Sequence, residues 1–185
     1  MALITQSDLE ARLQRSLTNA EQSAFPVVNS AIQTYVEGMI GSSVEEVEAS
    51  TRYYDGGIQY LAIDPSTDIS AVTYVDDESH VKSTFLTSEY IGAPANRTLK
   101  TSLRRRYGRF NSGFGNIAIT AKFSIYGDEK MRNVVKDAIL QALVSEIQNT
   151  GNTVKESIEG YSVEYATTEA KSALNSIKFF FPGVM

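Results

Sequence analysis

The 185-residue chain contains no cysteine and only one histidine, His80. Disulfide bonds and thiolate metal sites are therefore excluded, and a single imidazole cannot supply the histidine pair of a typical zinc site. The neighbouring turn Asp76-Asp77-Glu78 offers oxygen ligands of the kind that hard cations prefer, but we interpret it as a solvated surface turn. We expect neither a metal nor a cofactor.

Long apolar runs are also missing, since no stretch approaches the roughly 18 apolar residues that a membrane span needs. The opening "MALITQSDLEARL" contains Asp8 and Glu10 and lacks a basic flank followed by an apolar segment, so it does not predict a signal peptide. We therefore expect no membrane association. The chain is expected to act in the cytoplasm or in a particle that is assembled there.

Recognisable catalytic motifs are missing too. The chain has no phosphate-binding glycine loop, no nucleophile elbow and no histidine pair at helical spacing. We therefore expect that the protein is not an enzyme. Because two carboxylates can meet in any fold, an uncharacterised hydrolase stays open as a distant alternative.

Basic residues are concentrated in one part of the chain. Residues 90–127 contain seven Lys or Arg and no Asp or Glu, so they carry +7; because the whole chain carries -5, the remainder is near -12. The densest stretch is "SLRRRYGRFNSGFGN", residues 102–116. Its arginines are Arg104, Arg105, Arg106 and Arg109. This distribution is typical of a protein with two oppositely charged surfaces rather than of a uniformly basic nucleic-acid binder.

Three interpretations of residues 102–116 are open. The arginines, with stacking on Tyr107, Phe110 and Phe114, are compatible with a nucleic-acid-binding module, and "SGFGNIAI" partly matches a strand signature of RNA-recognition motifs. A second interpretation is a hairpin tip whose charges keep a sheet edge soluble. The third is contact with an acidic surface on a neighbouring subunit or partner. We favour the third, because a basic segment on an acidic body attracts other copies of the same chain.

Apolar residues at helical spacing predict four helices. The first follows a capping box at Ser7–Glu10, and the second begins at a similar signal, Thr18–Glu21, and ends at Gly41. Pro26 predicts a kink or a late start in this second helix. The other two helices are expected at about 128–149, as the most buried one, and at about 168–179.

Between Gly41 and Gly127 the apolar residues alternate, which predicts strands. "STRYYDGGIQYLAI" predicts a hairpin around Asp55-Gly56-Gly57, and "DISAVTYVDD" a further strand. "NRTLKTSLRRRYGRF" predicts a strand pair or hairpin arm, and "GNIAITAKFSIYG" predicts the clearest strand. Short connections favour an antiparallel sheet. The predicted fold class is α+β, a helical bundle of about four helices with an inserted antiparallel β-sheet of roughly five strands.

The order of these motifs resembles the head-to-tail connector (adaptor, or head completion) proteins of tailed bacteriophages. "TQSDLEARL" and "TNAEQSA" lead into a long helix, "DGG", "YLAI" and "ISAVTYV" follow, and "NIAITAKFSIYG" precedes "VVKDAILQALV". The sharpest match is "SIEGYSVEYAT" followed by "AKSALNSIK", a Gly-Tyr-Ser turn before the last helix. The resemblance extends over nearly the whole chain. One departure is that Gly127-Asp128-Glu129 opens the central helix, where the family often has a proline.

The resemblance implies a single connector domain over residues 1–185. Its parts are N-terminal helices at 1–41, a β insertion at 42–127, C-terminal helices at 128–180 and a tail at 181–185. It implies a structural virion protein that forms a homo-oligomeric ring, a dodecamer, under the portal protein. This head-to-tail adaptor extends the DNA channel and provides the attachment surface for a stopper or tail-completion protein. Genomic DNA passes through without sequence-specific binding, and the expected location is the virion neck, after assembly in the host cytoplasm.

The tail has a role of its own in this interpretation. Pro182 ends any preceding helix and leaves an apolar extension that a lone monomer gains nothing from exposing. In similar proteins this segment docks onto the portal. The resemblance therefore implies portal docking by Phe181, Pro182, Gly183, Val184 and Met185.

Overall fold

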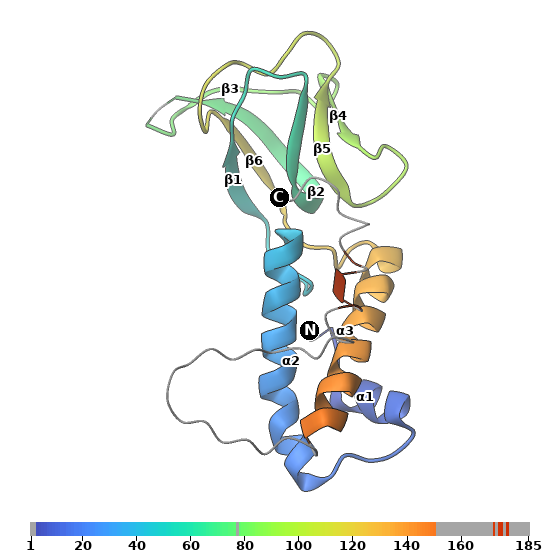
Figure 1. The fold of residues 1–185 in the computed structure, drawn as a ribbon. Coiled ribbons are helices and arrows are strands. Elements are labelled where there is room, and N and C mark those ends of the chain that lie inside the picture. The colour runs from blue at the N-terminus through green and yellow to red at the C-terminus, as the bar shows by residue number, and fades with distance from the viewer. Residues whose placement is uncertain (1–2, 77, 151–171, 173, 176, 178–185) are drawn as a thin grey trace. The chain divides into compact units, whose positions relative to one another are not determined.

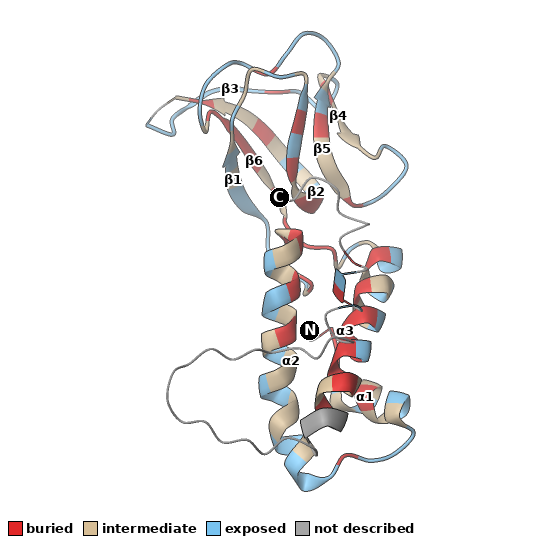
Figure 2. Ribbon diagram, in the orientation of Figure 1, coloured by how far each residue is buried: buried red, intermediate tan, exposed pale blue. Residues whose placement is uncertain are grey.

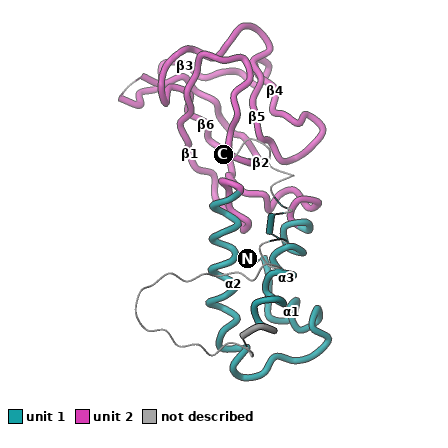
Figure 3. The backbone as a smooth tube through the Cα atoms, in the orientation of Figure 1, with its two compact units in different colours: residues 1–39, 133–182 teal, residues 40–132, 183–185 magenta. Residues whose placement is uncertain are grey.

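A computed structural model describes residues 3–76, 78–150, 172, 174, 175 and 177 of the chain, and its elements are labelled in Figure 1. The chain divides into two compact units (Figure 3). One consists of residues 1–39 and 133–182, and the other of residues 40–132 and 183–185. We call them the helical unit and the β unit and describe each by itself.

The structure describes the helices α1 (Gln6–Leu13), α2 (Asn19–Ile40) and α3 (Glu129–Thr150). α1 starts earlier than predicted, because its cap is Thr5 and not Ser7. Thr5 Oγ1 accepts a hydrogen bond from the Asp8 amide at 3.3 Å, and the Asp8 carboxylate accepts one from the Thr5 amide at 2.9 Å. The predicted capping box is wrong because both Thr5 and Ser7 are capping residues with an acid three positions later, and the chain uses the first pair.

α2 begins directly after Thr18, as the sequence predicts. The Glu21 carboxylate accepts a hydrogen bond from the Thr18 amide at 2.7 Å, and Arg15 donates two more at 2.8 and 2.7 Å. The helix continues through Pro26, so the alternative of a late start is wrong. Gly41, with a φ of 69°, follows its last residue in the left-handed conformation that ends many helices.

α3 carries more buried residues than α1 or α2 in the described part of the chain (Figure 2). The α3 residues of the helical unit that are completely buried are Val135, Ile139, Ala142 and Leu143. Their spacing of three or four residues makes one apolar stripe. None of the helices described has the length and apolar content that a membrane crossing requires. The predicted helix at 168–179 lies outside the described residues, apart from 172, 174, 175 and 177.

The β unit contains a six-stranded sheet in which all paired strands are antiparallel. The strands are β1 (Ser50–Tyr54), β2 (Tyr60–Val75), β3 (Val81–Thr84), β4 (Tyr90–Ala93), β5 (Lys100–Arg105) and β6 (Ile117–Lys122). Their order is β1-β6-β2-β5-β4, with β3 paired to β2. The α+β class and the antiparallel sheet are confirmed, with six strands instead of about five.

β1 and β2 do not form the predicted hairpin. β6 lies between them in the sheet, so that Ile117 is opposite Tyr54 on one side and Tyr74 on the other. The amides of Gly56 and Gly57 bind carbonyl groups of the segment before β6 instead of closing a tight turn. The two glycines therefore mark a contact with a distant segment, which no local turn signal reveals.

β2 is one 16-residue strand where the sequence predicts two. Its first part pairs with β5, and its second part pairs with β6 and β3. Irregularities between Ala62 and Ser66 and between Thr67 and Ala71, with Asp68 at a φ of 49°, lie between these two parts. Such irregularities bend a strand and let it pass from one part of a sheet to another. The β-unit core includes Leu61, Ile63, Val72, Phe85, Leu103, Phe110, Ile117, Ile119 and Phe123.

Candidate interaction surface

Two loops of the β unit are joined by hydrogen bonds: residues 55–59 between β1 and β2, and residues 106–116 between β5 and β6 (Figure 1). We call these two loops the loop end. The Gly56 amide donates to the Gly113 carbonyl at 2.9 Å, and the Gly57 amide donates to the Phe110 carbonyl at 3.0 Å. The longer loop is thus braced by backbone contacts over its length.

Side chains add to this bracing. The Asn116 side chain, in a residue only 6% exposed, accepts a hydrogen bond from the Gly56 amide at 3.0 Å and donates one to the Asn111 carbonyl at 2.9 Å. Asp55 accepts one from the Gly115 amide at 2.7 Å. A Cβ on Gly56 would lie 1.8 Å from the Asn111 carbonyl oxygen, so only glycine allows the loops to approach so closely.

The braced loop carries two aromatic side chains into solvent. Tyr107 is 81% exposed and Phe114 is 92% exposed. The nucleic-acid interpretation expects Phe110 to stack on a ligand together with them. Phe110 is only 1% exposed and packs edge-on against Phe85 in the core, with the ring centres 5.6 Å apart. Phe110 therefore cannot stack on a ligand, whereas the other two are free to contact a partner.

Three of the four candidate arginines, Arg104, Arg106 and Arg109, are exposed. None of the three forms an ion pair with another described residue. Arg104 lies with its guanidinium carbon 5.1 Å from the ring centre of Tyr60, its partner across β2 and β5. The surface is consequently basic and aromatic.

Arg105 differs from its neighbours because it faces the core side of the sheet. Its side chain is 15% exposed, lies over the Phe85 ring and forms an ion pair with Glu89 at 3.2 Å. The pKa of Glu89 is lowered, first by the hydrogen bond from the Leu86 amide and further by Arg105. Arg105 thus serves the β unit itself, and the four arginines do not form one surface.

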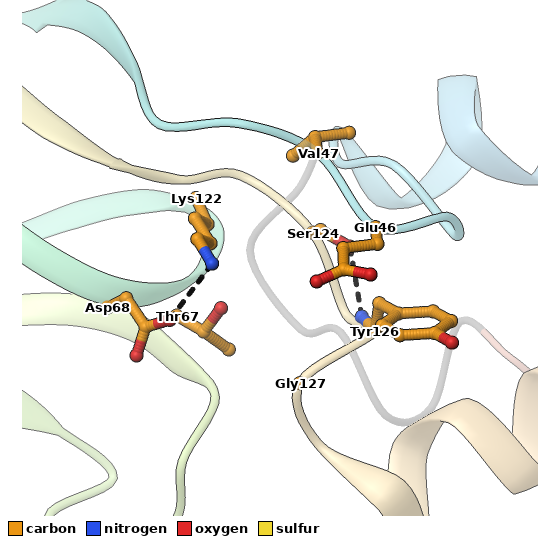
Figure 4. Close-up of a pocket in the computed structure, with 8 residues that line it drawn as sticks. All are labelled: Glu46, Val47, Thr67, Asp68, Lys122, Ser124, Tyr126 and Gly127. Carbon is orange, nitrogen blue, oxygen red and sulfur yellow. Dashed lines mark hydrogen bonds and ion pairs between the residues drawn. The ribbon is translucent and has the colours of Figure 1, made fainter. Parts of the chain in front are cut away.

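Carboxylates lie at the opposite end of β1, where the chain enters the β unit. A cavity of about 110 Å³ there is lined by Glu46, Val47, Thr67, Asp68, Lys122, Ser124, Tyr126 and Gly127 (Figure 4). Lys122 pairs with Asp68 at 3.6 Å. Glu46 and the nearby Glu48 are exposed, and neither forms an ion pair with a described residue. We call Glu46, Glu48 and Asp68 the acidic end.

The acidic turn after β2 is engaged by its own neighbours. Asp76 forms an ion pair with Lys82 at 2.7 Å and accepts a hydrogen bond from the His80 amide at 2.8 Å. The hydrogen bond from Lys82 is the main reason why the pKa of Asp76 falls to about 2. Asp77 lies outside the described residues. Among the residues that are described, no group of three or more acidic or histidine side chains is placed to bind a metal.

The predicted portal-docking residues, 181–185, lie outside the described part of the chain. Several residues that build the loop end or lie beside it could not be identified from the sequence. Asp55 and Gly56 fit the predicted hairpin turn, whereas Asn116, in the loop end, and Tyr60, at the start of β2, carry no signal of their roles. Their partners lie far away in the sequence, so only the two adjacent glycines gave a signal, and that signal fits a turn equally well.

Comparison with known proteins gives a structural match. No protein-family model matches the sequence, and no curated protein matches it. Among solved structures, the fold is similar to that of a chain in "Neck of empty GTA particle computed with C6 symmetry", with a TM-score of 0.56 and 11% sequence identity. The match covers 95% of this chain and 88% of that chain. At this identity the likeness concerns the fold.

Proposed function

We propose that the chain is a structural protein of the neck that joins head and tail in a phage-like particle. The observation that carries this proposal is the shared fold with a chain of a GTA particle neck, over 95% of this chain. The order of sequence motifs, which resembles phage head-to-tail connectors, supports it independently. The resemblance concerns sequence pattern and the match concerns backbone geometry, so the two arguments do not depend on each other.

In its finer form, the proposal is an adaptor ring of twelve copies beneath the portal. Twelve subunits are compatible with the sixfold symmetry used for the neck of the GTA particle, because a twelvefold ring contains a sixfold axis. The ring would extend the DNA channel and provide the attachment surface for a stopper or tail-completion protein. The protein would act without catalysis, in the virion neck, after assembly in the host cytoplasm.

Two contacts are proposed within this arrangement. Residues 181–185 dock onto the portal, as the family resemblance implies. The exposed arginines Arg104, Arg106 and Arg109 contact an acidic surface of a neighbouring subunit or partner ring, because guanidinium groups form strong paired hydrogen bonds with carboxylates. Arg105 is left out of this set, since its side chain already pairs with Glu89.

A nucleic-acid-binding module is the second candidate function. The observation that favours it is the exposure of Tyr107 and Phe114 on the same loop as Arg106 and Arg109, since aromatic and basic side chains together bind single strands. Such a module predicts affinity for short DNA or RNA that falls steeply with salt. A neck protein predicts protein rings instead.

Electron microscopy of the purified protein, alone and mixed with a portal protein from the same source, tests the proposal. The expected result is a ring of this chain stacked on the portal ring. Portal particles that never carry additional density would contradict it. A filter-binding assay with a labelled single-stranded oligonucleotide, run on the same preparation, decides whether the second candidate applies.

A further inference from the structure

We infer that the loop end of one copy of this chain binds the acidic end of a second copy, head to tail. The inference rests on the proposed ring and specifies the contact that holds neighbouring subunits together. On one side the contact residues are Arg106, Tyr107, Arg109 and Phe114. On the other side they are Glu46, Glu48 and Asp68, beside the cavity of Figure 4.

The loop end has the properties of a binding surface that is organised in advance. Phe114 is 92% exposed, yet the amide of the next residue, Gly115, is held by Asp55 at 2.7 Å, and the carbonyl of Gly113 is held by Gly56 at 2.9 Å. A braced loop loses little conformational entropy when a partner binds. Tyrosine and arginine are enriched among the few residues that contribute most of the binding energy in protein interfaces.

The acidic end is complementary in charge and accessible. Glu46 and Glu48 are exposed, and Glu46 lines an open cavity of about 110 Å³ together with Asp68 (Figure 4). One guanidinium group from Arg106 or Arg109 can donate two parallel hydrogen bonds to a carboxylate. Arg106, Arg109, Glu46 and Glu48 have no ion-pair partner among the described residues, so a contact between them breaks no existing pair, and Asp68 keeps its ion pair with Lys122 at 3.6 Å.

One copy cannot close this contact on itself, so a contact between the loop end and the acidic end needs two copies. The acidic end precedes β1 and the loop 55–59 follows it, and the five residues of β1 separate the two by roughly 16 Å at the usual rise per residue. A contact between two different surfaces of identical chains repeats from copy to copy. It closes into a ring when the rotation between copies allows it.

Charge reversal with rescue by mixing tests the inference. The first variant is Arg106→Glu with Arg109→Glu, and the second is Glu46→Arg with Glu48→Arg. In each variant both contacting surfaces have the same sign of charge. Sedimentation velocity over a concentration series measures the dissociation constant of self-association, which should rise roughly tenfold to a hundredfold for each arginine contact that is lost. An equimolar mixture of the two variants restores opposite signs at every contact, and association should return.

Arg97→Glu is the matched control, because Arg97 is exposed, basic and located in the β4–β5 turn, away from the loop end. This variant should associate like the wild type. Phe114→Ala provides a second test that leaves all charges in place, and it should also weaken association while keeping the melting temperature, since its ring is almost fully exposed. If a charge-reversed variant does not fold, the association of Phe114→Ala tests the proposed contact in its place.

Several results would overturn the inference. They are association that both reversed variants retain, a mixture that fails to recover, or a wild-type chain that stays monomeric up to its solubility limit. A further contradicting result is a chain that does not self-associate but binds a labelled 20-nucleotide single strand, with a salt dependence of binding that disappears in the double variant Arg106→Ala, Arg109→Ala. If both reversed variants still form rings on the portal, this contact is wrong and the proposed neck function stands.

Discussion

The guanidinium carbon of Arg105 lies 4.5 Å from the ring centre of Phe85, beneath the surface formed by its basic neighbours. The same side chain pairs with Glu89 at 3.2 Å and is only 15% exposed. One residue along the chain, Arg106 is exposed and has no ion-pair partner among the residues described. Arg105 therefore contributes to the packing of the β unit, whereas its neighbour Arg106 is available to contact a partner.

Replacing Arg105 with alanine should destabilise the β unit. The change removes the stacking on Phe85 and the packing of the side-chain stem, which together are worth about 1–2 kcal/mol. Urea denaturation followed by far-UV circular dichroism measures the free energy of unfolding. Arg106→Ala is the control and, on monomeric protein, should stay within about 0.5 kcal/mol of the wild type. Equal losses in both variants would contradict the division of tasks.

Two glycines should respond oppositely to alanine. At Gly56 a Cβ meets the Asn111 carbonyl oxygen at 1.8 Å, so Gly56→Ala must displace the braced loop and lower the melting temperature. At Gly38, inside α2, a Cβ meets nothing within 4 Å, and Gly38→Ala should stabilise the helix by about 0.5–1 kcal/mol. Differential scanning calorimetry distinguishes the two, and a neutral Gly56→Ala would show that the loops do not depend on this approach.

Acid should weaken the start of α2 through Glu21. The hydrogen bonds from Arg15, and after them that from the Thr18 amide, lower the pKa of Glu21 from its ordinary 4.5 to about 2. Its ionised form favours the folded state, so this contribution is complete above pH 4.5 and is lost as the pH falls through about 2. Glu21→Gln should therefore lose less stability than the wild type over that range.

Melting temperatures measured from pH 6 to pH 2 test this expectation. Glu48→Gln is the control, because Glu48 is exposed and forms no ion pair with a described residue. Since Glu48 belongs to the acidic end, all variants are measured at a protein concentration at which the chain is monomeric. The control curve should run parallel to that of the wild type. Parallel curves for Glu21→Gln as well would mean that the Glu21 hydrogen bonds add nothing to stability.

Removal of residues 181–185 tests the proposed portal docking. The shortened chain should remain folded and soluble but bind the portal ring more weakly, because the family resemblance implies docking by this apolar segment. Co-sedimentation with portal rings measures binding, and circular dichroism monitors folding. Unfolding on truncation would instead assign the segment to the core. Unchanged binding would exclude it from the portal contact.

Local patterns predicted much of the fold correctly. The spacing of apolar residues indicated α2 and α3, and alternation indicated β6, because these signals depend on neighbouring residues alone. The predicted hairpin failed because strand pairing is not local: β6, which follows β1 by more than sixty positions, lies between β1 and β2. The bend within β2 was missed for a related reason, since Asp64-Pro65 reads as a strand end.

The candidate surface was predicted in part. The charge run identified Arg104, Arg106 and Arg109, and the structure places these three on the surface. Sequence cannot separate Arg105 from them, because the alternation of faces along β5 only becomes known once its register with β2 is fixed. The acidic end escaped notice because Glu46 and Asp68 come together only through the fold.

The central claim, that this chain is a neck protein, predicts that it is a component of a tailed particle, and cryo-electron microscopy of particles purified from its source tests this most directly. The expected map contains a ring of this chain, traceable by its side chains, between the portal and the first tail component. In that map the loop end of each subunit faces the acidic end of the next. A neck map fully explained by other chains, with this protein absent from the purified particles, would contradict the claim.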